Sequence, residues 1–307
     1  MNSTLAIPST LIPYFDLGGT GAPLHFLHAN GYPPDCYEPL LELLKTEYRV
    51  FGMKLRPLWP DAKMDDLKDW DPLADDLQRF LSDTSTLLQA QDNASLSAGH
   101  EAAPVIGVGH SIGGIVTLRT AIRDPKKFRA LVLLDPVLFP PYFIAIWNIA
   151  RTLGIGYHVH PKISGAVKRR REFDNLDLVF RGYRNRTVFR YLSDENLWAY
   201  IRGITRQKAD GTYELVYSPE WESHIYYTGI WRDADLWRDL KYLELPILII
   251  RGAESDTFWE SAARLMKRKQ PKVRIEAVSQ STHLVPLERP KEVFEIMRSF
   301  LEQTFKV

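Results

Sequence analysis

The most informative part of the sequence is residues 105–114, which read Val105-Ile-Gly-Val-Gly-His-Ser-Ile-Gly-Gly114. A short apolar run leads into a glycine-flanked serine, and the following residues, 115–123, contain neither glycine nor proline. This order predicts a buried strand, a sharp turn and a helix. In such a turn the residues beside the serine must be small, while the serine hydroxyl projects from the backbone. The pattern predicts a nucleophile elbow at Ser111; the alternative is a serine in an ordinary strand-to-helix turn.

A serine at a helix start lies beside unpaired N–H groups that stabilise developing negative charge. With this motif the chain resembles the α/β-hydrolase family, and within it the serine-dependent members that carry a lid. The resemblance implies an α/β fold with a mostly parallel central sheet flanked by helices and an inserted, mainly helical cap. It also implies that the acid and the histidine of a catalytic triad follow the serine in that order.

The acid is expected in a loop after a later strand. Residues 245–257 read Leu245-Pro-Ile-Leu-Ile-Ile-Arg-Gly-Ala-Glu-Ser-Asp-Thr257, an apolar strand that runs into a polar loop. On this loop position we predict Asp256 as the acid. Glu254 in the same loop is one alternative. Asp135, directly after a predicted strand at 130–134, is the other, because some family members place the acid there.

The histidine is expected after the last strand and before a final helix. Residues 279–290 read Ser279-Gln-Ser-Thr-His-Leu-Val-Pro-Leu-Glu-Arg-Pro290 and follow a predicted strand at 273–278. The chain has eight histidines, and an isolated histidine is more often a structural polar residue than a catalyst. His283 differs in its order and its surroundings, which resemble the family's histidine loop. We therefore predict His283 as the general base that activates Ser111.

Two backbone N–H groups are expected to stabilise the oxyanion. Ile112, which follows the nucleophile, provides one of them. The resemblance implies that the second lies in the loop after an early strand. Residues 24–34, Leu24-His-Phe-Leu-His-Ala-Asn-Gly-Tyr-Pro-Pro34, have this form, and Asn30 is the best candidate. The alternative interpretation of this segment is a simple turn that bends at Gly31.

Roughly a hundred residues separate two predicted core strands, which is more than a connection requires. We therefore expect an α/β-hydrolase core from residues 1–135 and 245–307, with a helical cap inserted at 136–244. A polar stretch at 82–103 is expected to be a flexible surface insertion. The cap is rich in aromatic side chains, which line a substrate pocket or build the cap's own core. The side chains predicted to form the substrate pocket are His110, Tyr32, Phe139 and Trp147.

Two features of the cap have alternative interpretations. The apolar segment 136–150 is too short and too interrupted by proline to span a membrane. We expect it to pack on the core, and a contact with a membrane surface is the alternative.

The run Lys168-Arg-Arg-Arg171 makes the cap locally basic, together with Arg181, Arg184, Arg186 and Arg190. We expect these residues to form a solvated face, and the alternative is that some of them receive an anionic group of the substrate.

The composition agrees with that of a soluble enzyme of this size, and we expect a small molecule as its substrate. The net charge is +1, which does not suggest nucleic acid as a partner. The single cysteine, Cys36, excludes an internal disulfide and a cysteine-rich metal cluster. The first ten residues lack the basic and apolar regions of a signal peptide, so we expect a cytoplasmic protein.

These observations predict a serine hydrolase that requires no cofactor or metal and cleaves an ester or a related acyl bond in an apolar or aromatic substrate, with carboxylesterase activity as the central expectation. Thioester, lactone and amide substrates stay open, because the fold and triad do not fix the acyl group. An alternative within this class is hydrolysis of a carbon–carbon bond in a diketone. An alternative of another class is an inactive binding protein of the same fold. Epoxide hydrolysis and dehalogenation are disfavoured, because relatives with those activities attack with an aspartate at the elbow.

Overall fold

The structure, a computed structural model, describes residues 12–91 and 103–305. At its centre is a seven-stranded sheet with the strand order β1-β3-β2-β4-β5-β9-β10. The pair β1 and β3 is antiparallel, and the other neighbouring strands are parallel. The strands of this sheet are β1 (Tyr14–Gly18), β2 (Pro23–Leu27), β3 (Arg49–Met53), β4 (Val105–His110), β5 (Phe128–Leu134), β9 (Ile247–Gly252) and β10 (Arg274–Val278).

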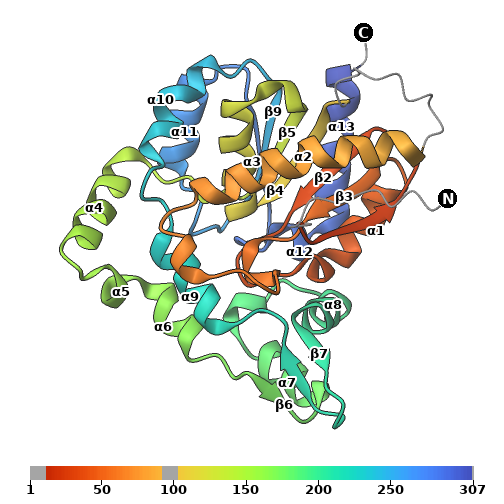
Figure 1. Cartoon of the computed structure of the whole chain (residues 1–307), viewed down its shortest axis with the longest axis vertical. Coiled ribbons are helices and arrows are strands. Elements are labelled where there is room, and N and C mark those ends of the chain that lie inside the picture. The colour runs from red at the N-terminus through yellow and green to blue at the C-terminus, as the bar shows by residue number, and fades with distance from the viewer. Residues whose placement is uncertain (1–11, 92–102, 306–307) are drawn as a thin grey trace, which may run out of the picture.

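Two hydrophobic clusters cover the two faces of this sheet. Successive side chains of a strand point to opposite faces, and β5 follows this rule: Leu131 and Leu133 join one cluster, whereas Val132 and Leu134 join the other. In Figure 1, α2 (Asp71–Gln91) crosses in front of the central strands, and it packs on α3 (Ile112–Arg123). On the other face, α1 (Glu38–Lys45) packs on α13 (Pro290–Phe305). Helices α11 (Glu260–Lys269) and α12 (Val285–Glu288) complete the core.

The segment between β5 and β9 forms the left side and the bottom of the molecule in Figure 1, where it is coloured green to cyan. We call residues 136–244 the insertion. It carries a small antiparallel sheet of order β6-β8-β7, which the expectation of a mainly helical segment did not include. Its elements are α4 (Pro141–Thr152), α5 (Gly156–Val159), α6 (Pro161–Val167), β6 (Glu172–Phe173), α7 (Leu176–Arg184), α8 (Asp194–Ile204), β7 (Thr205–Gln207), β8 (Tyr213–Leu215), α9 (Pro219–Thr228) and α10 (Ala234–Asp239).

The α/β architecture predicted from the sequence is confirmed, including the mostly parallel sheet. Residues 82–91 are helical and continue α2, and residues 92–102 lie outside the described residues. The flexible insertion expected at 82–103 stays a prediction. Within 12–91 and 103–305, no helix is long and apolar enough to cross a membrane.

Candidate active site

Ser111 lies between the end of β4 and the start of α3, with φ 58° and ψ −119°. A positive φ is uncommon for a residue with a side chain and marks local strain. The turn is possible because its neighbours are glycines. A methyl group on Gly109 would lie 2.3 Å from the carbonyl oxygen of Gly113, and one on Gly113 would lie 2.2 Å from that of Leu27. The local sequence therefore forms the predicted strand, sharp turn and helix.

The side chains of Ser111, His283 and Asp135 form a hydrogen-bonded series. The His283 Nε2 atom lies 2.9 Å from Ser111 Oγ, and His283 Nδ1 lies 3.3 Å from Asp135 Oδ2. Asp135 directly follows β5, and its side chain is fully buried. When Nδ1–H donates to this carboxylate, Nε2 is free to accept the hydroxyl proton of the serine.

The structure does not bring the predicted acid Asp256 into this series. Its side chain is 75% exposed, and its Oδ1 accepts a hydrogen bond from the Thr257 hydroxyl at 3.0 Å. Glu254, the other candidate in this loop, accepts hydrogen bonds from Arg190 and Tyr191 of the insertion. The carboxylate in contact with the imidazole is that of Asp135, which the sequence offered only as an alternative.

His110, predicted as a pocket residue, is instead fully buried in a chain of hydrogen bonds. Its Nε2–H donates to the carbonyl oxygen of His283 at 2.8 Å, so its Nδ1 accepts from the Tyr37 hydroxyl at 2.7 Å. That hydroxyl in turn accepts from the N–H of Ala29 at 3.1 Å. The chain joins the histidine loop to the loop after β2. Nothing local in the sequence indicated Tyr37, which lies 73 residues from its partner.

The histidine loop is fixed a second time by Glu288 of α12. This buried carboxylate accepts from the N–H of Thr282 at 2.6 Å and from the Thr282 hydroxyl at 2.9 Å. Burial raises the pKa of Glu288. Thr282 directly precedes His283, so the backbone that carries the imidazole is held from both sides.

Three buried histidines make the fold sensitive to acid. Burial lowers the pKa of His25 to about 3, that of His28 to about 4, and that of His110 well below its usual value. Below pH 6.5 the unfolded chain therefore takes up protons that the folded chain does not, and the free energy of unfolding falls by up to about 1.4 kcal/mol per pH unit for each group. Burial raises the pKa of Asp233 to about 6 and also raises that of Glu288, so these two carboxyl groups oppose the effect of the histidines.

We expect the midpoint of urea unfolding, followed by circular dichroism, to fall between pH 7.5 and pH 5.5. Most carboxylates stay ionised over this range, so the histidines dominate the change. An equal or higher midpoint at pH 5.5 would contradict this assignment of buried, neutral imidazoles.

A cavity of about 980 Å³ lies over the serine. The core contributes Ser111, His283 and the loop after β2, and the insertion contributes the facing walls. Three of the four predicted pocket residues, Tyr32, Phe139 and Trp147, line it, whereas His110 does not. The sequence interpretation missed Trp259, whose ring contacts those of Phe139 and Phe143 at 5.1 and 4.9 Å between centroids.

The two candidate oxyanion donors, Asn30 and Ile112, both line the cavity beside Ser111. The side chain of Asn30 is engaged elsewhere: its Nδ2 donates to the carbonyl oxygen of Glu222 at 3.0 Å, and its Oδ1 accepts from the Tyr217 hydroxyl at 2.9 Å. Residues of the insertion thus hold the side chain of Asn30 in place.

Comparisons with known proteins show the family to which the chain belongs. A model of the alpha/beta hydrolase family matches residues 26–296, so the chain belongs to this family. It is 20% identical to (E)-2-((N-methylformamido)methylene)succinate hydrolase of Acinetobacter baylyi, over 99% of both chains. Among solved structures, E-2-(acetamidomethylene)succinate hydrolase has a TM-score of 0.68 at 17% identity, over 94% of both chains. An esterase of M. tuberculosis has a TM-score of 0.65 at 20% identity, over 96% of this chain and 90% of that one.

Proposed function

We propose that the protein is a serine hydrolase that cleaves an ester or a related acyl bond through Ser111, His283 and Asp135. The observation that carries this proposal is the distance of 2.9 Å between Ser111 Oγ and His283 Nε2 inside the cavity. A nucleophile within hydrogen-bond distance of a base, with the base oriented by a third group, is the arrangement that acyl transfer requires.

In the first step, Ser111 Oγ attacks the carbonyl carbon of the substrate while His283 Nε2 takes the hydroxyl proton. The tetrahedral intermediate collapses, the bond to the leaving group breaks, and the imidazolium returns the proton to that group. Water then attacks the acyl-enzyme with the same base, which releases the acid and restores the serine. Asp135 stabilises the imidazolium and is not itself protonated.

The negative charge of the intermediate needs donors that are already in place. We assign this role to the backbone N–H groups of Ile112 and Asn30, which flank the serine in the cavity. Ile112 is the first residue of α3, so its N–H has no partner within the helix.

The insertion acts as a cap that selects the substrate. One side of the cavity is aromatic, with Phe139, Phe143 and Trp147 from the insertion and Trp259 from the core. Such a wall suits an apolar or aromatic group. The name of the Acinetobacter relative includes a formamido group, which makes an amide-type acyl bond a second candidate.

The proposal is tested with a fluorophosphonate probe and a chain-length series of p-nitrophenyl esters. We expect stoichiometric labelling at Ser111 and ester turnover with a preferred acyl length. Labelling without ester turnover would contradict the ester assignment and favour an amide or carbon–carbon bond. Failure of the folded protein to be labelled would contradict a hydrolase and favour the inactive binding protein.

A further inference from the structure

One face of α6 forms part of the cavity wall. Lys162, Gly165 and Ala166 line the cavity, and their spacing of three or four residues places Lys162 beside the other two on one side of the helix. Arg169 also lines the cavity. It lies two residues beyond the end of α6, where its N–H donates to the carbonyl oxygen of Ala166 at 3.1 Å. The two cations, Lys162 and Arg169, are seven residues apart in the sequence. Between them are two small residues, which leave room for a bound molecule to lie along this face.

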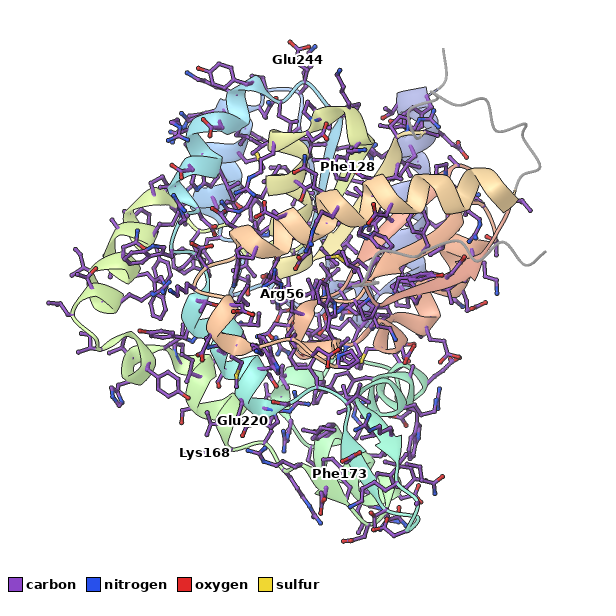
Figure 2. The ribbon with its side chains drawn as sticks, in the orientation of Figure 1. Arg56, Phe128, Lys168, Phe173, Glu220 and Glu244 are labelled. Atoms are coloured by element: carbon purple, nitrogen blue, oxygen red, sulfur yellow. The ribbon has the colours of Figure 1, made fainter. Side chains whose placement is uncertain are left out.

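Arg169 differs from its neighbours in the basic run at 168–171. Lys168, labelled at the lower left of the molecule in Figure 2, is exposed. The side chains of Arg170 and Arg171 are 67% and 55% exposed and form ion pairs on the surface. The side chain of Arg169 is only 16% exposed, so this guanidinium is turned towards the cavity rather than the solvent.

The Arg169 guanidinium is held in place by a buried carboxylate. One of its N–H groups donates to Glu222 Oε2 at 2.5 Å, and the side chain of Glu222 is 9% exposed. A guanidinium has five N–H donors in a rigid plane. Among the described residues the Arg169 side chain has no other hydrogen-bond partner. Further donors of a fixed, partly desolvated cation are therefore available to a ligand.

Lys162, at the other end of the face, is also incompletely neutralised. Its Nζ lies 3.9 Å from Asp256 Oδ1, which is beyond hydrogen-bond distance. Across the described lining of the cavity there are four Lys and Arg side chains against three carboxylates. The cavity therefore carries an excess of one positive charge, which favours an anion.

We propose that this face of α6, together with the turn that follows it, binds a carboxylate group of the substrate, with Arg169 as the principal contact and Lys162 as a second cation. The inference rests on the proposed function and deepens it: the substrate is an acyl compound whose carboxylate lies away from the bond that Ser111 attacks. The planar fork of an arginine matches the two oxygens of a carboxylate. The aromatic wall then receives the apolar part of the same molecule.

The test compares two esters of equal acyl length, mono-4-nitrophenyl adipate and 4-nitrophenyl hexanoate. For Arg169→Met we expect the ratio of kcat/KM for the adipate ester to that for the hexanoate ester to fall about 10-fold to 100-fold, mainly through KM. Arg170→Met, in the same basic run but on the surface, is the matched control and should leave the ratio unchanged. Equal losses for both esters, with an unchanged ratio, would overturn the proposal.

Removing Arg169 alone leaves Glu222 buried without its partner, which can destabilise the protein. The double variant Arg169→Met/Glu222→Gln avoids this unpaired charge and should show the same fall in the ratio. A normal ratio in the double variant would show that Arg169 only neutralises Glu222, and would overturn the proposal.

A binding measurement separates this inference from the proposed function, because it needs no turnover. The affinity of Ser111→Ala for each ester is measured by calorimetry, with and without Arg169→Met. We expect tighter binding of the adipate ester, weakened about 10-fold to 100-fold by the second substitution. Equal affinity for the two esters would overturn the carboxylate site even if the wild-type protein is an active esterase.

Discussion

Replacing Asp135 with asparagine is expected to lower kcat for the preferred ester about 10⁴-fold, the size of effect seen when the acid of a triad is made neutral. Asparagine has nearly the same shape but presents no negative charge to His283 Nδ1, which lies 3.3 Å away. The imidazole then loses both its preferred tautomer and the stabilisation of its protonated form. Asp256→Asn is the matched comparison and is expected to change kcat less than about threefold, since its side chain is exposed to solvent.

The measurement is steady-state ester hydrolysis, normalised to sites titrated with the fluorophosphonate probe. Circular dichroism establishes that Asp135→Asn is folded, which matters because this side chain is fully buried and its Oδ1 has no hydrogen-bond partner among the described residues. A loss of about 10⁴-fold in Asp256→Asn, with near-normal turnover in Asp135→Asn, would return the acid role to Asp256.

The order of the strands explains why Asp135 is near the histidine. Strand β5 pairs directly with β4, which ends at the elbow, whereas β9 lies one strand further away. Asp135 is the first residue after β5, and its N–H donates to Ile250 of β9 at 2.7 Å. Asp256 lies four residues beyond the end of β9, in an exposed loop. Both positions follow an apolar strand, so the sequence pattern alone could not distinguish them.

Local sequence patterns therefore predicted the parts of the site that local backbone geometry creates. The elbow at Ser111 follows from small residues on both sides of the serine, and the histidine loop from its place after the last strand. The contact between His283 and Asp135 joins residues 148 positions apart, and no local pattern encodes it. The same limit explains His110, whose partner Tyr37 comes from the short helical turn before α1.

In the insertion, the sequence did not show which charged residues face the solvent and which face the cavity. Its basic run was expected to be a solvated face, and this agrees with the exposure of Arg170 and Arg171. Arg169 departs from it because the chain that follows α6 places this residue at the cavity wall, where it pairs with Glu222 of α9. A charge run does not show which of its members faces inward, since that depends on how the helices of the insertion pack on one another.

Replacing Ser111 with alanine is expected to lower kcat by at least about 10⁵-fold, because no acyl-enzyme can form without the hydroxyl. The residual rate comes from the oxyanion donors and the cavity, which the substitution leaves in place. Labelling by the fluorophosphonate probe should disappear together with turnover. Substantial turnover in a folded Ser111→Ala protein would show that another residue is the nucleophile.

A second substitution separates the strain at Ser111 from its chemistry. At φ 58° and ψ −119°, alanine keeps the unfavourable contacts of a side chain, whereas glycine adopts this conformation freely. Ser111→Gly is therefore expected to be more stable to urea than Ser111→Ala by about 1 kcal/mol, although both are inactive. Equal stability of the two variants would mean that the elbow stores no strain. A more stable glycine variant would show that the chain accepts a less favourable backbone at this position in order to present a nucleophile to His283.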